Sequence, residues 1–362
     1  MKTKGLFLAI TVLALFSWSC SKTSDLNSAS VPVSLKSALT EGVTDLTSAV
    51  NAITTSTSYQ VISGPSDLTT KSLEKWPLDT VTHSILLADI KGVYDYKATS
   101  VKRGTGSILR FFNKTAENTQ MVVRLLEEKV KASRSLLRYT PSDTLLTNNY
   151  VVTLSDYQYK FRYFNGWTYQ MASGIKIKDV DAGVLKIATS NDKTNGYHFA
   201  SEFKFPNGYV TKTSYTSGDT AISLYAISNA TKTLYEEKYT AIKTSTESRH
   251  REREFTLTIG NVKVVRAMGK TSLDSAKVYV SGVLQTKAKV EIIDITTDAT
   301  DKCIAGKKRE LKITFDDGTT KTFTELAGTV ITDISTLFAS MRQANFATAI
   351  IDWIAWDIYT KK

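Results

Sequence analysis

Cysteine, histidine and proline are scarce in this chain of 362 residues, which has 2 cysteines, 3 histidines and 5 prolines. No two histidines stand at the spacing of metal ligands, so a zinc site lacks the side chains that it needs and no cofactor is expected. Glycine (18) and proline are too few for a collagen-like repeat. The apolar (42%) and charged (22%) fractions are those of a globular protein, which excludes a fully disordered chain and a multi-span membrane protein.

Sequence motifs of enzymes are missing as well. The chain has no Gly-x-Ser-x-Gly nucleophile elbow and no glycine-rich phosphate loop. Glycoside hydrolysis needs only two carboxylates, about 5–10 Å apart. Three acid pairs offer them: Asp179/Asp181, Glu236/Glu237 and Asp316/Asp317. Such pairs also occur by chance, and Glu236 and Glu237 should point to opposite faces of a strand. The sequence therefore favours a non-catalytic protein, with a hydrolase acting through Asp179 or Glu236 as an alternative.

The chain carries a formal net charge of +11, from 46 lysines and arginines against 35 aspartates and glutamates. The excess is spread along the chain, without the clustered footprint of a nucleic-acid-binding module, so no nucleic-acid partner is expected. A diffuse positive charge favours anionic neighbours such as lipid headgroups, and a basic surface retained for solubility also explains it. The alternating charges of residues 249–254 indicate a solvated strand or turn.

The first nineteen residues have the pattern of an export signal. Lys2 and Lys4 precede an apolar run from Leu6 to Phe16. This run is shorter than the roughly 20 residues that span a bilayer. A short apolar stretch behind lysines, ending in small residues, is typical of a secretory signal. The sequence therefore predicts a signal peptide over residues 1–19.

The next residues indicate a lipid anchor. The segment Ser17-Trp18-Ser19-Cys20 resembles the lipobox of bacterial lipoproteins, and in particular of Bacteroidota-like ones. The resemblance is confined to the N-terminus. It implies cleavage before Cys20, acylation of Cys20 and attachment to the membrane through several acyl chains, which is enough for stable anchoring. Because Ser21 is not the aspartate associated with retention at the inner membrane, the resemblance also implies an outer-membrane location.

The cysteine count agrees with lipidation. Cys303 is the only other cysteine, so acylation of Cys20 leaves it alone. The alternative is a Cys20–Cys303 disulfide in an oxidising compartment.

Residues 20–75 are rich in serine and threonine, which predicts a tether. Within it, an amphipathic helix is expected near residues 35–54, with Ser34 as its N-cap. Its apolar residues follow steps of three and four: Leu35, Leu39, Val43, Leu46, Val50 and Ile53. This helix needs a partner surface, either on the main domain or on another protein.

Residues 76–147 are predicted to form a mixed α/β segment that packs on the main domain. Its clearest periodicity predicts a helix over 119–138, ended by Pro141, with Val122, Leu126 and Val130 on one face.

Residues 148–362 are predicted to form an antiparallel β domain with C-terminal helices. Asn-Gly and Asp-Gly turn signals, among them Asn195-Gly196 and Asn207-Gly208, separate alternating strands between 148 and 325, and the connections are too short for parallel crossovers. Apolar periodicity over 334–359 predicts helices that cover one face or end of the sheet. The expected fold class is α+β, mainly β: a many-stranded antiparallel meander sheet with flanking N-terminal and C-terminal helices.

Six aromatic residues of one predicted hairpin are the candidate ligand platform. They are Tyr157, Tyr159, Phe161, Tyr163, Trp167 and Tyr169. Tyrosine and tryptophan supply rigid, amphipathic contact area on which sugars stack. The alternative is that these rings are the core side of the hairpin, since aromatic residues of one parity in a strand usually pack inward.

Together these features predict a non-catalytic lipoprotein of the cell envelope that binds or scaffolds through its sheet. An exposed aromatic face favours a glycan ligand, whereas a sheet curled around an apolar concavity favours a lipid. Two alternatives remain: an envelope hydrolase acting on glycans, and a structural partner of an outer-membrane complex that docks through the 35–54 helix.

Overall fold

A computed structural model of the chain describes nine segments. They are residues 34–62, 82–97, 107–131, 146–162, 166–244, 251–268, 276–295, 308–341 and 344–361. The predicted signal peptide, Cys20 and Cys303 lie outside these segments. The residues from Ser34 to Lys362 belong to one compact unit.

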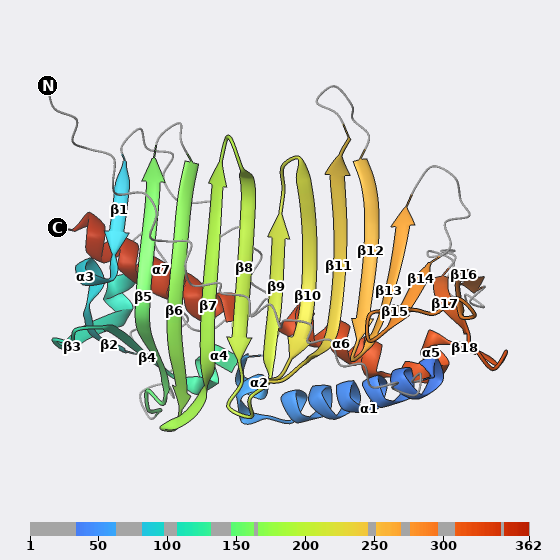
Figure 1. The fold of residues 1–362 in the computed structure, drawn as a ribbon. Helices are drawn as coiled ribbons and strands as arrows, with labels where there is room; N and C mark the ends of the chain where they lie inside the picture. The colour runs from blue at the N-terminus through green and yellow to red at the C-terminus, as the bar shows by residue number, and fades with distance from the viewer. Residues whose placement is uncertain are drawn as a thin grey trace, which may run out of the picture. The chain divides into compact units, whose positions relative to one another are not determined.

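A long antiparallel sheet dominates the structure, as the fold class predicted (Figure 1). From β5 to β15 each strand pairs with the next one along the chain, as in a meander. These strands are β5 Tyr150–Arg162, β6 Gly166–Ile177, β7 Val180–Asp192, β8 Gly196–Lys204, β9 Val210–Thr216, β10 Thr220–Ser228, β11 Thr233–Lys243, β12 Arg251–Ile259, β13 Val262–Met268, β14 Lys277–Val280 and β15 Val283–Leu284. The predicted turn at Asn195-Gly196 links β7 to β8, and the one at Asn207-Gly208 links β8 to β9. Gly196 and Gly208 have φ of 74° and 88°, which favours glycine at these turns.

The segment 76–147 supplies the other end of the same sheet. It contributes β1 His83–Leu86, β2 Gly92–Tyr96, β3 Phe112–Ala116 and β4 Met121–Leu125, with the short helices α3 Leu87–Ile90, η2 Ile108–Phe111 and α4 Glu127–Lys131. Strand β5 is long enough to pair with β4 along its first half and with β1 along its second half. Strand β4 runs parallel to β2, while the other pairs of this sheet are antiparallel. The sheet therefore extends across the boundary expected at residue 147.

The helix predicted over 119–138 is wrong for its first part. Residues 121–125 form β4, a strand with neighbours on both sides, and only Glu127–Lys131 are helical; residues 132–138 lie outside the described segments. Met121, Val122, Val123 and Leu125 are buried and Arg124 is exposed, as in a strand covered on both faces over most of its length. The β-branched Val122 and Val123 tolerate either structure, and pairing with β2 and β5 decides in favour of the strand.

The two faces of the sheet differ in what covers them. On the inner face, Tyr225 packs against Phe338 with ring centroids 5.1 Å apart, and Tyr157 donates a hydrogen bond to Asp352. The outer face carries polar cross-strand contacts such as the Lys212–Glu202 ion pair (3.1 Å). Phe338 belongs to α6 Val330–Met341 and Asp352 to α7 Ala344–Thr360. These helices thus cover part of the inner face, as predicted for the 334–359 region.

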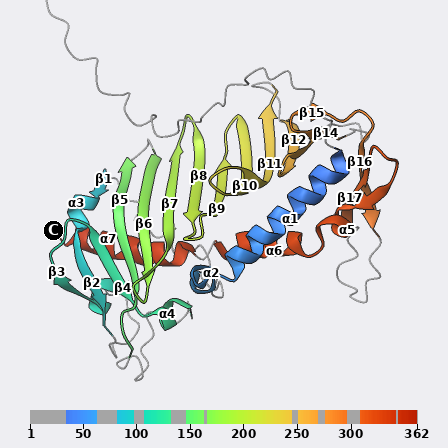
Figure 2. The ribbon, with the colours of Figure 1, turned by 60° about the horizontal axis from the view of Figure 1, so that its bottom comes forward.

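The predicted 35–54 helix is α1 Leu35–Thr54, which lies across hairpin turns at one end of the sheet (Figures 1 and 2). Ser34 caps it by accepting a hydrogen bond of 3.2 Å from the Ser37 amide. Asn207, in the β8–β9 turn, donates to the Ala52 carbonyl over 3.0 Å, and Lys232, in the β10–β11 turn, pairs with Asp45. The apolar face of α1 is therefore buried against its own chain, which is the first of the two partner surfaces expected for this helix.

Helix α2 Thr57–Ile62 follows α1. A small second sheet of β16 Lys289–Ile295, β17 Lys308–Thr314 and β18 Thr320–Thr322 stands next to the last strands and leads into α5 Phe323–Ala327. Among the described helices, none combines the length and apolarity that crossing a membrane requires.

Candidate functional site

The predicted aromatic platform is partly inside the core. Tyr157 is 1% exposed and Tyr159 is 6% exposed on the inner face of β5. The Tyr157 hydroxyl group reaches Asp352 of α7 over 3.1 Å, and the Tyr169 ring meets Tyr157 edge-on at 5.9 Å. A ligand has no access to Tyr157 or Tyr159 in this arrangement, because α7 covers the part of the hairpin on which they lie.

The carboxyl group of Asp352, in this buried cluster, has a pKa far from its ordinary value. Burial raises the pKa of its carboxyl to about 7, and hydrogen bonds from Tyr157 and Tyr169 oppose that rise only in part. Burial also raises the pKa of Tyr159 to about 12. A carboxyl group that ionises near neutral pH is often found at catalytic sites. Asp352, however, is 4% exposed within a packed core, so a substrate does not reach it.

The remaining residues of the predicted platform lie closer to the edge of the area that α7 covers. Phe161 is half-buried, and its ring lies 6.5 Å from His83. Trp167 is half-buried, and its ring approaches Tyr197 rather than α7. Tyr163 lies outside the described residues. The predicted platform thus divides into core residues and a residue, Trp167, that belongs to a different aromatic group.

That group runs across the strands at the end of the sheet remote from α1. The Trp167 ring lies 6.3 Å from Tyr197, and the Tyr197 ring lies 6.0 Å from Tyr215. Tyr215 is 43% exposed, while Trp167 and Tyr197 are half-buried. We call Trp167, Tyr197 and Tyr215, from β6, β8 and β9, the aromatic band.

Strand register puts the aromatic band on the inner face. Trp167 pairs with Asn191, and Asn191 pairs with Tyr197. Tyr215 pairs with Phe199, which is two residues beyond Tyr197 and so shares its face. In Figure 1, α7 crosses the middle of β5 to β7 and α6 lies lower, near β10 and β11, and the upper ends of these strands extend beyond both helices. The band therefore occupies inner-face surface that α6 and α7 leave open.

The sequence contains a feature that points to Tyr197 and Tyr215, but it is missed when each hairpin is considered separately. Both tyrosines lie within two residues of a turn at the same end of the sheet as Trp167, and the three residues come together only when the register of β6 to β9 is known. Alternation within one strand reveals which residues share a face, but it does not align residues from separate hairpins.

The three acid pairs lie at two hairpin turns and on one strand of the sheet. Asp179 adopts a left-handed conformation (φ 64°) in the β6–β7 turn, and Asp181 lies 3.6 Å from Lys176. Glu236 and Glu237 point to opposite faces, as predicted, and Glu237 accepts a hydrogen bond of 2.8 Å from Tyr235. The other pair lies in the β17–β18 turn, where hydrogen bonds from Thr319 and the nearby Lys36 hold the pKa of Asp317 at about 2.

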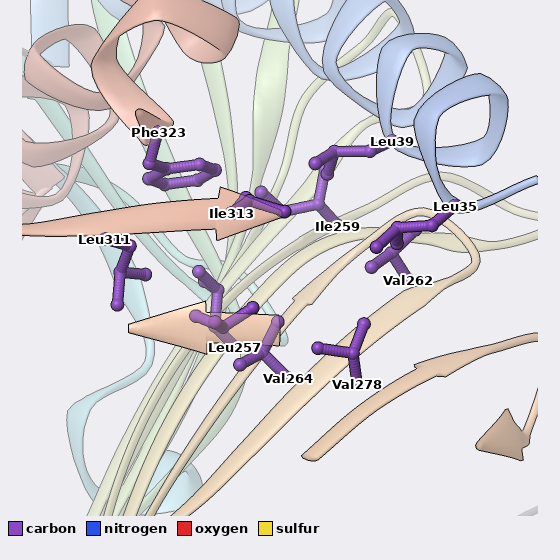
Figure 3. A pocket seen from close by; sticks show the side chains of 11 residues that line it. Leu35, Leu39, Leu257, Ile259, Val262, Val264, Val278, Leu311, Ile313 and Phe323 are labelled. Carbon is purple, nitrogen blue, oxygen red and sulfur yellow. The ribbon is translucent and has the colours of Figure 1, made fainter. Parts of the chain in front are cut away.

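A cavity between the end of the large sheet and the small sheet is lined by apolar residues (Figure 3). Its volume is about 20 Å³, close to the space of a single water molecule. Leu35 and Leu39 of α1, Leu257 of β12 and Phe323 of α5 are among its walls. This space is a packing gap in the core and is too small for an acyl chain.

Among the described residues, no group of three or more histidine, cysteine, aspartate and glutamate side chains is arranged to hold a metal ion. The open inner face with its aromatic band is therefore the candidate functional site. Comparisons of the chain with protein-family models, with curated proteins and with solved structures find no match, so the function has to be inferred from the chemistry of this face.

Proposed function

We propose that the protein is a lipoprotein of the cell envelope, anchored through Cys20 at the outer membrane, that binds a glycan on the open inner face of its sheet. The observation that carries the binding role is the aromatic band, in which Tyr215 is 43% exposed beside Tyr197 and Trp167. A sheet that places three neighbouring aromatic rings outside its packed core keeps apolar area in contact with solvent, which is typical of a binding surface.

The chemistry of the band suits a sugar. Tyrosine and tryptophan present a flat apolar ring together with a polar group, and both lose little conformational freedom on binding. Beside the rings, the inner face offers the amide side chain of Asn191, and the Thr189 hydroxyl, which donates to the His198 carbonyl over 2.8 Å, can still accept a hydrogen bond. Ring stacking with polar groups at the sides matches a pyranose, which has apolar C–H faces and hydroxyl groups at its edge.

The other ligand and activity classes have less support. A lipid carrier requires an apolar cavity for an acyl chain, and the cavity between the sheets measures only about 20 Å³. A hydrolase acting through Asp179 or Glu236 requires a paired carboxylate at the substrate. Asp179 lies in an exposed turn, and its pair Asp181 lies beside Lys176, with 3.6 Å between the Lys176 Nζ and the Asp181 Oδ1. Glu236 lies on the outer face of β11, and its pair Glu237 lies on the inner face.

Affinity electrophoresis of the full-length chain in gels that contain bacterial or host polysaccharides tests the proposal. At least one polysaccharide should retard the wild-type chain. Trp167→Ala and Tyr215→Ala should each weaken that binding roughly two- to tenfold, the range expected from losing one aromatic contact.

Tyr279→Ala is the matched control, because Tyr279 lies in register with Lys263 and therefore on the outer face. Equal losses in Tyr279→Ala and in the band variants would count against a binding surface on the inner face. Turnover of a polysaccharide, abolished by Asp179→Asn, would replace the binding role with catalysis.

A further inference from the structure

Successive side chains of a strand point to opposite faces, so the alternating charges at the start of β12 are divided between the two faces of the sheet. Arg253 pairs with Ala241, and Phe255, on the same parity, pairs with Tyr239. Tyr239 in turn lies in register with Ser223 and, through it, with Tyr215 of the aromatic band. Arg251 and Arg253 therefore point to the inner face, whereas Glu252 and Glu254 point to the outer face.

Two further cations share this part of the inner face. Lys243 pairs in register with Arg251, and Arg266 pairs with Phe255. We call Lys243, Arg251, Arg253 and Arg266, which lie on β11, β12 and β13, the basic corner.

The basic corner is only weakly neutralised by its surroundings. Asp219 lies 3.9 Å from Lys243, and its side chain is 88% exposed. Arg251 donates a hydrogen bond of 2.8 Å to the Gly218 carbonyl, which fixes its guanidinium group beside the β9–β10 turn. Within the described segments, neither Arg253 nor Arg266 forms an ion pair. This part of the face therefore has two guanidinium groups without an ion pair among the described residues, three strands from the exposed ring of Tyr215.

We infer that the glycan bound by this face is an acidic polysaccharide, with its sugar rings on the aromatic band and its carboxylates on the basic corner. This inference depends on the proposed glycan-binding function. Guanidinium groups hold carboxylates through two parallel hydrogen bonds, which gives both affinity and direction. From Trp167 on β6 to Arg253 on β12, six strand spacings give a distance of roughly 29 Å, so an extended sugar chain that crosses the strands contacts both regions.

The distribution of charge favours a polysaccharide over a single-stranded nucleic acid. A nucleic acid carries a phosphate at every nucleotide and needs cations along its whole path. Here the cations occupy one end of the face, and the inner-face positions beside the aromatic band are the uncharged Thr189, Asn191 and Ser217. A polymer with neutral stretches and carboxylates at intervals matches this division.

Affinity electrophoresis of the full-length chain in gels with polygalacturonate or with neutral dextran tests the inference. Polygalacturonate should retard the wild-type chain more than dextran does. The Arg253→Gln/Arg266→Gln double variant should bind polygalacturonate at least about tenfold more weakly, because each lost charge-assisted hydrogen bond accounts for about that factor. Raising the ionic strength from about 0.01 M to about 1 M should weaken the binding, since the Debye length falls from roughly 30 Å to roughly 3 Å.

The Lys238→Gln/Lys263→Gln double variant removes the same charge from the outer face of β11 and β13 and should leave the affinity unchanged. Equal losses in both double variants, or equal retention by dextran and polygalacturonate, would overturn the acidic ligand while leaving glycan binding intact. Tighter binding of a single-stranded oligonucleotide than of polygalacturonate at equal salt would also overturn it. If no polysaccharide is retained, the proposed function fails together with the inference.

Discussion

The hydroxyl group of Tyr157 on β5 donates a hydrogen bond of 3.1 Å to the carboxylate of Asp352 on α7, which is 195 positions further along the chain. This contact joins the C-terminal helix to the first long hairpin of the sheet. It also places an ionisable group in the core, since Asp352 is 4% exposed. The docking of α7 should therefore depend on pH.

The pKa of Asp352 sets the sign and the window of that dependence. Burial raises this pKa from 3.8 to about 7 in the folded chain. Between about pH 4 and pH 7 the folded chain keeps a proton that the unfolded chain has lost, so the contribution of Asp352 to stability falls as pH rises. Compared with wild type, Asp352→Asn should be more stable at pH 8, by roughly 1–4 kcal/mol at 1.36 kcal/mol for each pKa unit, and the two chains should converge near pH 4.

Urea unfolding of both chains across this pH range measures the difference. Asp333→Asn is the control, because Asp333 is exposed on α6. Parallel stability curves for wild type and Asp352→Asn would show that the carboxyl stays ionised in the folded chain.

Gly42 marks the point where α1 lies closest to the sheet. A Cβ atom at this position would lie 2.9 Å from the carbonyl oxygen of Ile259, at the β12–β13 turn. Gly42→Ala should therefore destabilise the protein by roughly 1–3 kcal/mol, the cost of overpacking, although alanine favours helix. Thermal unfolding compares it with Ser48→Ala on the exposed side of α1, which should stay within about 0.5 kcal/mol of wild type. A stabilising Gly42→Ala would show that α1 stands further from this turn.

Ser173 of β6 is a buried hydroxyl group in the core, 1% exposed, and its oxygen finds no hydrogen-bond partner among the described residues. An unsatisfied buried hydroxyl costs roughly 1–3 kcal/mol, so Ser173→Ala should stabilise the protein by about 1 kcal/mol. Urea unfolding against Ser214→Ala, a half-buried serine on the outer face of β9, measures the effect. If Ser173→Ala lost stability, the hydroxyl would have a partner such as a buried water molecule.

The proposed anchor at Cys20 predicts that substitutions of the two cysteines have different effects on membrane attachment. Cys20→Ala should move the protein from the membrane to the soluble fraction, because the acyl chains are attached at this residue. Cys303→Ala should stay in the membrane fraction. Mass spectrometry of the mature N-terminus checks the same point, and an unmodified Cys20 in a soluble protein would contradict lipidation.

Local patterns in the sequence determined the elements of this fold. The three- and four-residue steps from Leu35 to Ile53 predicted α1, and the turns at Asn195-Gly196 and Asn207-Gly208 predicted the boundaries of β7, β8 and β9. These features follow from contacts between residues close in sequence: a helix face, a turn with positive φ and an alternating strand. The fold class follows because successive hairpins can only form an antiparallel sheet.

Contacts between distant segments decided the rest. Residues 121–125 form a strand because β2 and β5 supply hydrogen-bond partners. The helical periodicity of the local sequence contains no information about these partners. Alternation placed Tyr157 and Trp167 on one face, but the path of α7 decided that Tyr157 is buried by Asp352 while Trp167 joins Tyr197 and Tyr215. A side chain's exposure depends on what covers it, and here the covering helix lies nearly two hundred residues away in the sequence.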